Sequence, residues 1–112
     1  MRLTVVISAK IQDKFYAEIQ SGRKRFEVRS EDFQDAAYIR YISSLTGRQL
    51  GVWSINSTFT ISSSDRSALY SLTAVDKEFT DKEFPVLPVR LIHVARLGNE
   101  VTLNDIFPRE ES

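Results

Sequence analysis

A short segment of alternating side chains, placed directly after a glycine, constrains the fold of this chain most. Between residues 23 and 30 apolar and charged side chains alternate, with Phe26 and Val28 on one side and Arg25, Glu27 and Arg29 on the other. This period of two is typical of a half-buried β-strand. Upstream, residues 11–20 carry apolar side chains at helical spacing, and Gly22 follows as a stop signal. The sequence predicts a helix, a turn, and a strand with one apolar face that joins the core and one polar face.

The rest of the chain is rich in β-forming segments. Strands are predicted over residues 3–8, 37–43, 50–61 and 89–97, and a second helix over residues 66–77 with Asp65 as its N-cap. Residues 76–84 are interpreted as a charged connection, residues 98–99 as a turn, and residues 102–107 as a short closing turn. This set predicts a mixed α+β fold, mainly β, forming a small barrel of about five to six mostly antiparallel strands with two or three short helices.

Composition narrows the class of protein. At 112 residues, with 42% hydrophobic and 27% charged residues, the chain fits one domain, over residues 1–107, and a flexible C-terminal tail, residues 108–112. There is no cysteine, which excludes disulfides and a thiol nucleophile. With His93 as the single histidine, no metal site is expected, and no phosphate-binding loop or serine-hydrolase elbow is present, so no cofactor is expected. The short apolar start resembles neither a signal peptide nor a membrane span, which favours a cytoplasmic protein with no membrane partner.

Positive charge is concentrated in the first half of the chain. Fifteen Lys and Arg balance fifteen Asp and Glu overall. Residues 1–50 hold nine basic and six acidic residues, a balance of +3, whereas residues 51–112 hold six and nine, a balance of −3. A site for a polyanion is therefore expected in the first half.

The segment from residue 7 to residue 30 resembles the signature of ASCH domains, which belong to the PUA-like β-barrel superfamily. That pattern is a strand, a helix ending in Ile/Val-x-Ser-Gly, and then x-Lys-x-x-Glu-x-Arg. The matching residues are Ile19, Ser21, Gly22, Lys24, Glu27 and Arg29. Residues 37–42 and 51–55 resemble the strand pair that usually follows. Two departures are Gln12, where many members carry lysine, and Trp53, where smaller or acidic residues are common.

The resemblance implies a cleft beside the barrel, lined by Lys24, Glu27 and Arg29, that holds RNA or a nucleoside. Some bacterial members are N4-acetylcytidine amidohydrolases that use a lysine matching Lys24, a threonine where this chain has Glu27, and a separate glutamate. Another ASCH protein cleaves single-stranded RNA. The resemblance therefore leaves both a binding module and a hydrolase open.

The residue chemistry supports a ligand site independently. Arg29 offers a planar fork for phosphate or a base edge, and Lys24 a point charge. Glu27, between two arginines, is expected to stay ionised and to accept hydrogen bonds from a base or ribose. Lys24 reaches these groups only if the chain bends at Gly22. The plainer alternative is a solvated strand face with weak ion pairs.

Three readings follow from these residues. The preferred one is an RNA- or nucleotide-binding module that uses Lys24, Glu27, Arg29, Arg25 and Lys10, with Tyr41 or Trp53 stacking on a base. The second is a nucleoside amidohydrolase or ribonuclease with Lys24 and Glu27 as catalytic residues. The third is a protein-interaction barrel that uses the acidic second half. The aromatic residues could equally belong to the core.

Overall fold

A computed structural model describes residues 5–73, 76–102 and 104 of the chain. In this part the strands are β1 (Val6–Ile11), β2 (Phe26–Arg29), β3 (Tyr38–Ser43), β4 (Gln49–Ser62) and β5 (Leu91–Val101). The helices are α1 (Asp13–Gln20), α2 (Arg66–Thr73) and α3 (Lys77–Glu83). None of these helices combines the length and the apolar character needed to cross a bilayer. The predicted tail, residues 108–112, lies outside the described residues, as does most of the predicted closing turn.

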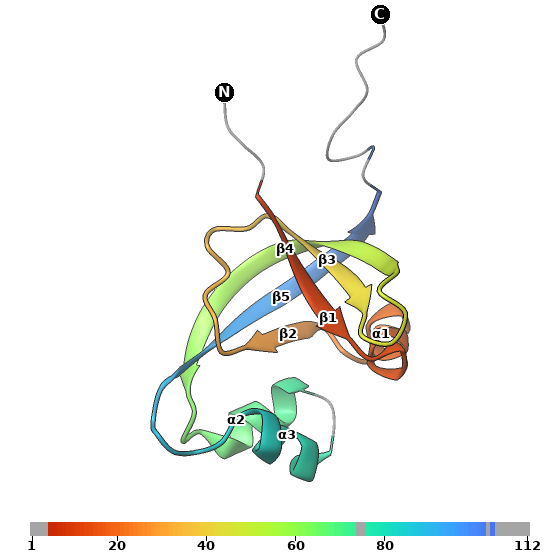
Figure 1. Cartoon of the computed structure of the whole chain (residues 1–112). Coiled ribbons are helices and arrows are strands. Elements are labelled where there is room, and N and C mark those ends of the chain that lie inside the picture. The colour runs from red at the N-terminus through yellow and green to blue at the C-terminus, as the bar shows by residue number, and fades with distance from the viewer. Residues whose placement is uncertain (1–4, 74–75, 103, 105–112) are drawn as a thin grey trace, which may run out of the picture.

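The strands form one curled sheet in the order β1-β3-β4-β5-β2 (Figure 1). The pair β1–β3 is parallel, and the other neighbouring pairs are antiparallel. Helix α1 lies at one end of the curled sheet, whereas α2 and α3 form a separate pair below it (Figure 1). The predicted mixed fold, mainly β with mostly antiparallel strands, is therefore confirmed, and the sheet is a half-barrel.

Two hydrophobic clusters cover the two faces of the sheet. Inside the curl, Ile39 and Tyr41 of β3, both fully buried, pack with Tyr16 and Ile19 of α1. On the other face, Val28, Ile92 and Val94 pack against the fully buried Leu69 of α2. Both helical units are thus attached to the sheet by apolar contacts, one on each face.

Strand β2 turns one of its two faces into the curl of the sheet. Paired residues of antiparallel neighbours share a face, and Glu27 pairs with the fully buried Ala95 while Arg29 pairs with His93. Glu27 therefore points into the curl of the sheet and not onto a solvated face. The apolar side of the strand, Phe26 and Val28, faces the α2 cluster. The alternation correctly predicted a strand, and the position of Glu27 does not fit the plainer alternative of a solvated strand face.

Several boundaries also differ from those predicted. β1 ends later than the predicted residues 3–8 because it stays paired with β3 as far as Ile11, and residues 3 and 4 lie outside the described residues. β5 continues through residues 98–99, the predicted turn, because the backbone at Gly98 approaches the Ser54 side chain of β4 closely and Asn99 donates its N–H to Ser54 Oγ at 2.9 Å. A Cβ at this position would meet the side chains of Ser54 and Asn56, so Gly98 marks close packing of β4 and β5 and not a chain reversal.

The second predicted helix is two helices. α2 ends at Thr73, and α3 begins after Asp76, whose side-chain Oδ1 accepts the N–H of Phe79 at 2.8 Å. This is an N-cap, the signal that starts a new helix. The charged segment of residues 76–84 therefore contains a third helix, α3, that carries Phe79 and Glu83.

Candidate ligand-binding pocket

The turn between α1 and β2 directs Lys24 inward. Gly22 has φ of +82°, a left-handed conformation that glycine adopts without strain. The N–H of Ser21 donates to Ala17 O at 3.0 Å and that of Lys24 donates to Glu18 O at 2.9 Å, so the chain folds back on the end of α1. Residues 23–25 consequently lie in a turn, and β2 starts only at Phe26. The bend that the sequence hypothesis required is present, and Lys24 lies half-buried.

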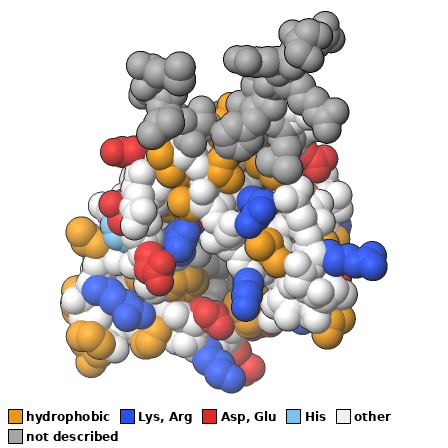
Figure 2. All heavy atoms as spheres, turned by 45° about the horizontal axis from the view of Figure 1, so that its top comes forward, with side chains coloured by type: hydrophobic (Ala, Val, Ile, Leu, Met, Phe, Trp, Pro, Cys, Tyr) orange, Lys and Arg blue, Asp and Glu red, His pale blue; other side chains and the backbone are white. Residues whose placement is uncertain are grey.

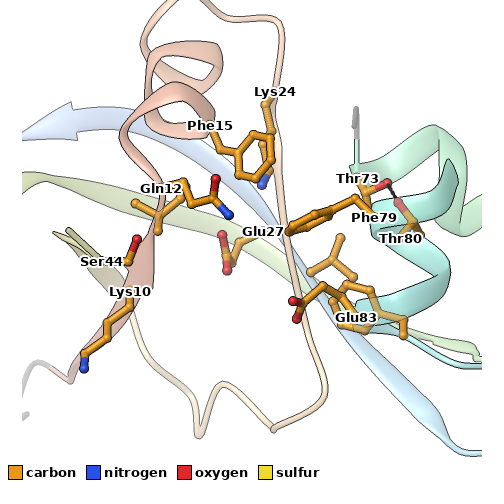
Figure 3. A pocket seen from close by; sticks show the side chains of 13 residues that line it. Lys10, Gln12, Phe15, Lys24, Glu27, Ser44, Thr73, Phe79, Thr80 and Glu83 are labelled. Atoms are coloured by element: carbon orange, nitrogen blue, oxygen red, sulfur yellow. Dashed lines mark hydrogen bonds between the residues drawn. The ribbon is translucent and has the colours of Figure 1, made fainter. Parts of the chain in front are cut away.

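This turn forms one wall of a pocket of about 270 Å³ between the half-barrel and α3. Figure 3 shows Lys24, Gln12 and Phe15 above Glu27, with Phe79 and Glu83 facing them from α3. We call this cavity the Glu27 pocket. Its lining is Lys10, Ile11, Gln12, Phe15, Lys24, Glu27, Val28, Ser44, Thr73, Phe79, Thr80, Glu83 and Phe84. The space-filling view likewise shows a hollow around which side chains of both charges gather (Figure 2).

Glu27 is held at the inner side of the pocket by Tyr41. The Tyr41 hydroxyl donates to Glu27 Oε1 at 2.9 Å, and within the described residues Glu27 Oε2 has no hydrogen-bond partner. Burial raises the pKa of Glu27 above its ordinary value, although the Lys24 charge, the Tyr41 hydrogen bond and the Arg29 charge each lower it. Burial likewise raises the pKa of Tyr41 well above its ordinary value, so the phenol stays protonated and donates. The cationic neighbours do lower the pKa of Glu27, as expected, but burial has the larger effect and acts in the opposite direction.

The raised pKa of Glu27 predicts a pH dependence of stability. A carboxyl with a raised pKa contributes stability that is complete below its unfolded pKa, near 4.5, and is lost as the pH rises through the folded pKa. We expect the free energy of unfolding of the native protein, relative to Glu27→Gln, to decrease as the pH rises above about 4.5 and then to level. Urea unfolding of both proteins at closely spaced pH values measures this difference. A difference that stays constant or increases with pH would contradict the assignment.

Aromatic rings form the outer wall of the pocket. Phe15 of α1 and Phe79 of α3 contact each other edge to face, with ring centroids 5.0 Å apart and planes at 62°. This contact connects two elements that lie on opposite sides of the pocket (Figure 3). Both rings are half-buried, so apolar surface remains open beside the polar groups. The pocket thus combines an apolar wall with hydrogen-bonding groups, the usual composition of a small-molecule site.

The residues predicted to bind a ligand are divided among three places. Lys10, Lys24 and Glu27 line the Glu27 pocket. Arg25 and Trp53 line a second hollow on the other side of Lys24. Arg29 lies at neither; its guanidinium is 3.0 Å from Glu31 Oε2 and stacks over the buried ring of Phe33. The positive charge of Arg29 nevertheless lowers the pKa of Glu27.

Tyr41 does not have the predicted role. Its side chain is 0% exposed, so no face of the ring is open to stack on a base. Its function in the pocket is to position Glu27 through the hydroxyl. Trp53 is partly exposed, and its Nε1–H donates to the Tyr16 hydroxyl at 3.1 Å, which fixes the indole in place.

Several lining residues were not predicted from the sequence. They are Phe15, Ser44, Thr73, Phe79, Thr80, Glu83 and Phe84, and Gln12 was noted only as a departure from the ASCH pattern. The signal that could have identified the α3 residues is Asp76, a good N-cap residue placed before a segment with two phenylalanines. In the part of the chain that the structure describes, no group of three or more His, Asp or Glu residues is placed to hold a metal ion.

No protein-family model matches the sequence, and no curated protein sequence does either. Three crystal structures of an ASCH protein from Zymomonas mobilis and its single-residue variants are similar in fold. The unmodified protein gives a TM-score of 0.65 at 17% sequence identity over 90% of this chain and 74% of that chain. Its variants give 0.66 at 17% identity, over 90% and 76% of the two chains, and 0.62 at 16% identity, over 95% and 80%. This chain therefore has the ASCH fold, as the residues from Ile19 to Arg29 predict.

Proposed function

We propose that the Glu27 pocket binds the base and sugar of a nucleoside or nucleotide. The observation that carries the proposal is the Glu27 carboxyl group, which Tyr41 holds through one oxygen while the other is open toward a pocket that also contains Lys24. A fixed carboxyl oxygen accepts the N–H groups that amino-bearing bases present. The Lys24 ammonium supplies a donor for base or sugar oxygens beside it.

The size and the walls of the pocket suit this ligand. Its volume of about 270 Å³ lies just below the range of about 300–1,000 Å³ typical of drug-sized ligands. A planar ring could stack on one of the two rings, Phe15 or Phe79, and contact the edge of the other, since their planes lie at 62°. The charges that line the pocket balance, because two lysines, Lys10 and Lys24, are matched by two glutamates, Glu27 and Glu83. A neutral, hydrogen-bonding group therefore fits here better than a phosphate.

A calorimetric titration with the four common ribonucleosides tests the proposal. We expect binding of at least one nucleoside, weakened in Glu27→Ala by roughly tenfold to a hundredfold, since a hydrogen bond to a charged or partly charged group contributes about 1.5–3 kcal/mol. Glu78→Ala, an exposed change on α3 that does not line the pocket, is the matched control. If no nucleoside binds, or if Glu27→Ala binds as tightly as the unchanged protein, the proposal is wrong.

Hydrolysis of a modified nucleoside or of single-stranded RNA is the second candidate. The observation that favours it is a carboxyl group with a raised pKa beside Lys24 in one pocket, an arrangement that suits general acid–base chemistry. Incubation with N4-acetylcytidine and with a single-stranded RNA, followed by chromatography of the products, tests it. Product that forms with the unchanged protein but not with Glu27→Gln supports an enzyme, and no product from either substrate removes this reading.

A further inference from the structure

A second hollow lies on the other side of Lys24 from the Glu27 pocket. Its volume is also about 270 Å³, and it is bounded by the end of α1, the turn at Gly22, and strands β4 and β5. We call it the Arg96 cleft. Its lining is Ile19, Gln20, Gly22, Lys24, Arg25, Trp53, Asn56, Arg96, Leu97, Gly98 and Asn99. Lys24 lines both hollows, so the two are neighbours.

The charges of the Arg96 cleft differ from those of the Glu27 pocket. Three cations line it, Lys24, Arg25 and Arg96, and no Asp or Glu does. Within the described residues none of these three makes an ion pair, whereas Arg23, Arg29 and Arg66 each have a carboxylate partner. Unpaired cations gathered around a concave surface attract an anion.

Two of these cations come from neighbouring positions of paired backbone segments. Arg25 O accepts the N–H of Leu97 at 2.9 Å, and in the next position Phe26 pairs with Arg96. Arg96 shares a face of the sheet with its partner Phe26, whereas Arg25 precedes the strand, and both residues line the cleft. Arg25 Nε also donates to Gly22 O at 3.3 Å, which limits the positions open to its guanidinium.

The C-terminal end of α1 bounds the same cleft, and a helix C-terminus repels anions. Here that effect is reduced, because the carbonyls of its last turn already accept hydrogen bonds. Ser21 N–H donates to Ala17 O, Lys24 N–H to Glu18 O, and Gly22 N–H to Ile19 O. With those carbonyls occupied, the three side-chain cations dominate the charge of the cleft.

The neutral side chains that line the cleft favour a nucleic acid over a small inorganic anion. The indole of Trp53 is partly exposed, and its edge is fixed by the hydrogen bond to Tyr16. Three side-chain amides, Gln20, Asn56 and Asn99, also line the cleft. An aromatic surface beside Lys and Arg is the combination by which proteins hold the bases and the backbone of a single strand.

We propose that the Arg96 cleft binds the phosphodiester backbone of single-stranded RNA next to the nucleotide held in the Glu27 pocket, with Lys24 contacting the phosphate between them. The inference rests on the proposed function, which it makes more specific, because the ligand becomes a polymer and not a free nucleoside. An acidic peptide would meet the same cations, but it has no planar groups for Trp53 to stack on.

Fluorescence anisotropy with a labelled eight-nucleotide RNA tests the proposal, and the free nucleoside that binds best is titrated in parallel. We expect the RNA to bind more tightly than the nucleoside, and Arg25→Ala/Arg96→Ala to weaken RNA binding at least tenfold while leaving nucleoside affinity unchanged. The slope of log affinity against log salt should become shallower by about 0.7 for each lost phosphate contact. Arg48→Ala/Arg90→Ala removes the same charge from exposed positions outside the cleft and is the control.

The outcomes separate the two proposals. Nucleoside binding together with RNA binding that is equal in the cleft and control variants would overturn the role of the cleft and leave the Glu27 pocket as a nucleoside site. Absence of nucleoside binding would overturn the proposed function, while RNA binding that still depended on Arg25 and Arg96 would support the cleft. A glutamate-rich peptide that displaced the RNA at equal concentration would show general anion binding and contradict the proposal.

Discussion

Lys24→Ala is expected to weaken binding of both a nucleoside and a single-stranded RNA, because Lys24 lines both hollows. Loss of a charge-assisted hydrogen bond of about 1.5–3 kcal/mol corresponds to roughly a tenfold to hundredfold loss in affinity for the nucleoside. The loss for RNA should be larger, since a phosphate contact disappears as well. Titration of both ligands against the variant measures the two losses.

Lys24→Ala should also change the pH dependence of binding. The Lys24 charge lowers the pKa of Glu27, so its removal raises that pKa further. The carboxyl then stays protonated to a higher pH, and the pH at which binding changes should move upward. A purely structural role for Lys24 would not produce this displacement. Titrations in buffers from pH 5 to pH 8 detect it.

Two matched variants complete this test. Lys82→Ala removes a charge from an exposed position on α3 that lines neither hollow and should leave both affinities unchanged. Lys24→Arg keeps the charge and should retain more RNA affinity than nucleoside affinity, because a guanidinium serves a phosphate well and fits a small pocket poorly. Equal affinities for the unchanged protein and Lys24→Ala would contradict the assignment of Lys24 to either hollow.

The sequence predicted the turn that matters most for the site. Gly22 after an amphipathic helix indicated a sharp change of direction, and the structure shows that this change turns Lys24 inward. A glycine after a helix is a reliable signal because the backbone angle φ and the residue at which a helix ends depend on nearby residues. The alternation in β2 similarly predicted a strand, whose core-facing residue Val28 is buried.

Long-range packing could not be predicted in the same way. Glu27 lies inside the curl because β2 pairs with β5 at Ala95, a partner almost seventy residues away that no local pattern specifies. Tyr41 is buried for the same reason, since its neighbours come from several elements. The sequence could therefore identify Glu27 as a site residue, but it could not show that burial raises its pKa.

Leu69 is the fully buried side chain by which α2 packs on the sheet, with the partly buried Leu72 beside it. Leu69 is 0% exposed and packs with Val28, Ile92 and Val94, whereas α3 does not contribute to that cluster beyond the adjoining Phe84. α3 is joined to α2 by the buried hydrogen bond of 2.9 Å between the hydroxyls of Thr73 and Thr80 and by the ion pair of 2.6 Å between Arg66 and Asp81. The wall of the Glu27 pocket that carries Phe79 and Glu83 is thus held in place through α2, together with the contact of Phe79 with Phe15 of α1.

Leu69→Ala is therefore expected to lower the free energy of unfolding by about 2–5 kcal/mol, the usual cost of removing a fully buried leucine side chain. Urea unfolding measures this, with Leu45→Ala as the control, because Leu45 is 85% exposed and its truncation should change stability little. Even under conditions where Leu69→Ala remains folded, nucleoside affinity should fall, since the α3 wall loses its anchor while Lys24 and Glu27 stay on the half-barrel. A folded Leu69→Ala protein with unchanged nucleoside affinity would show that α2 and α3 do not form the wall of the binding pocket, and the ligand would then be held by the half-barrel alone.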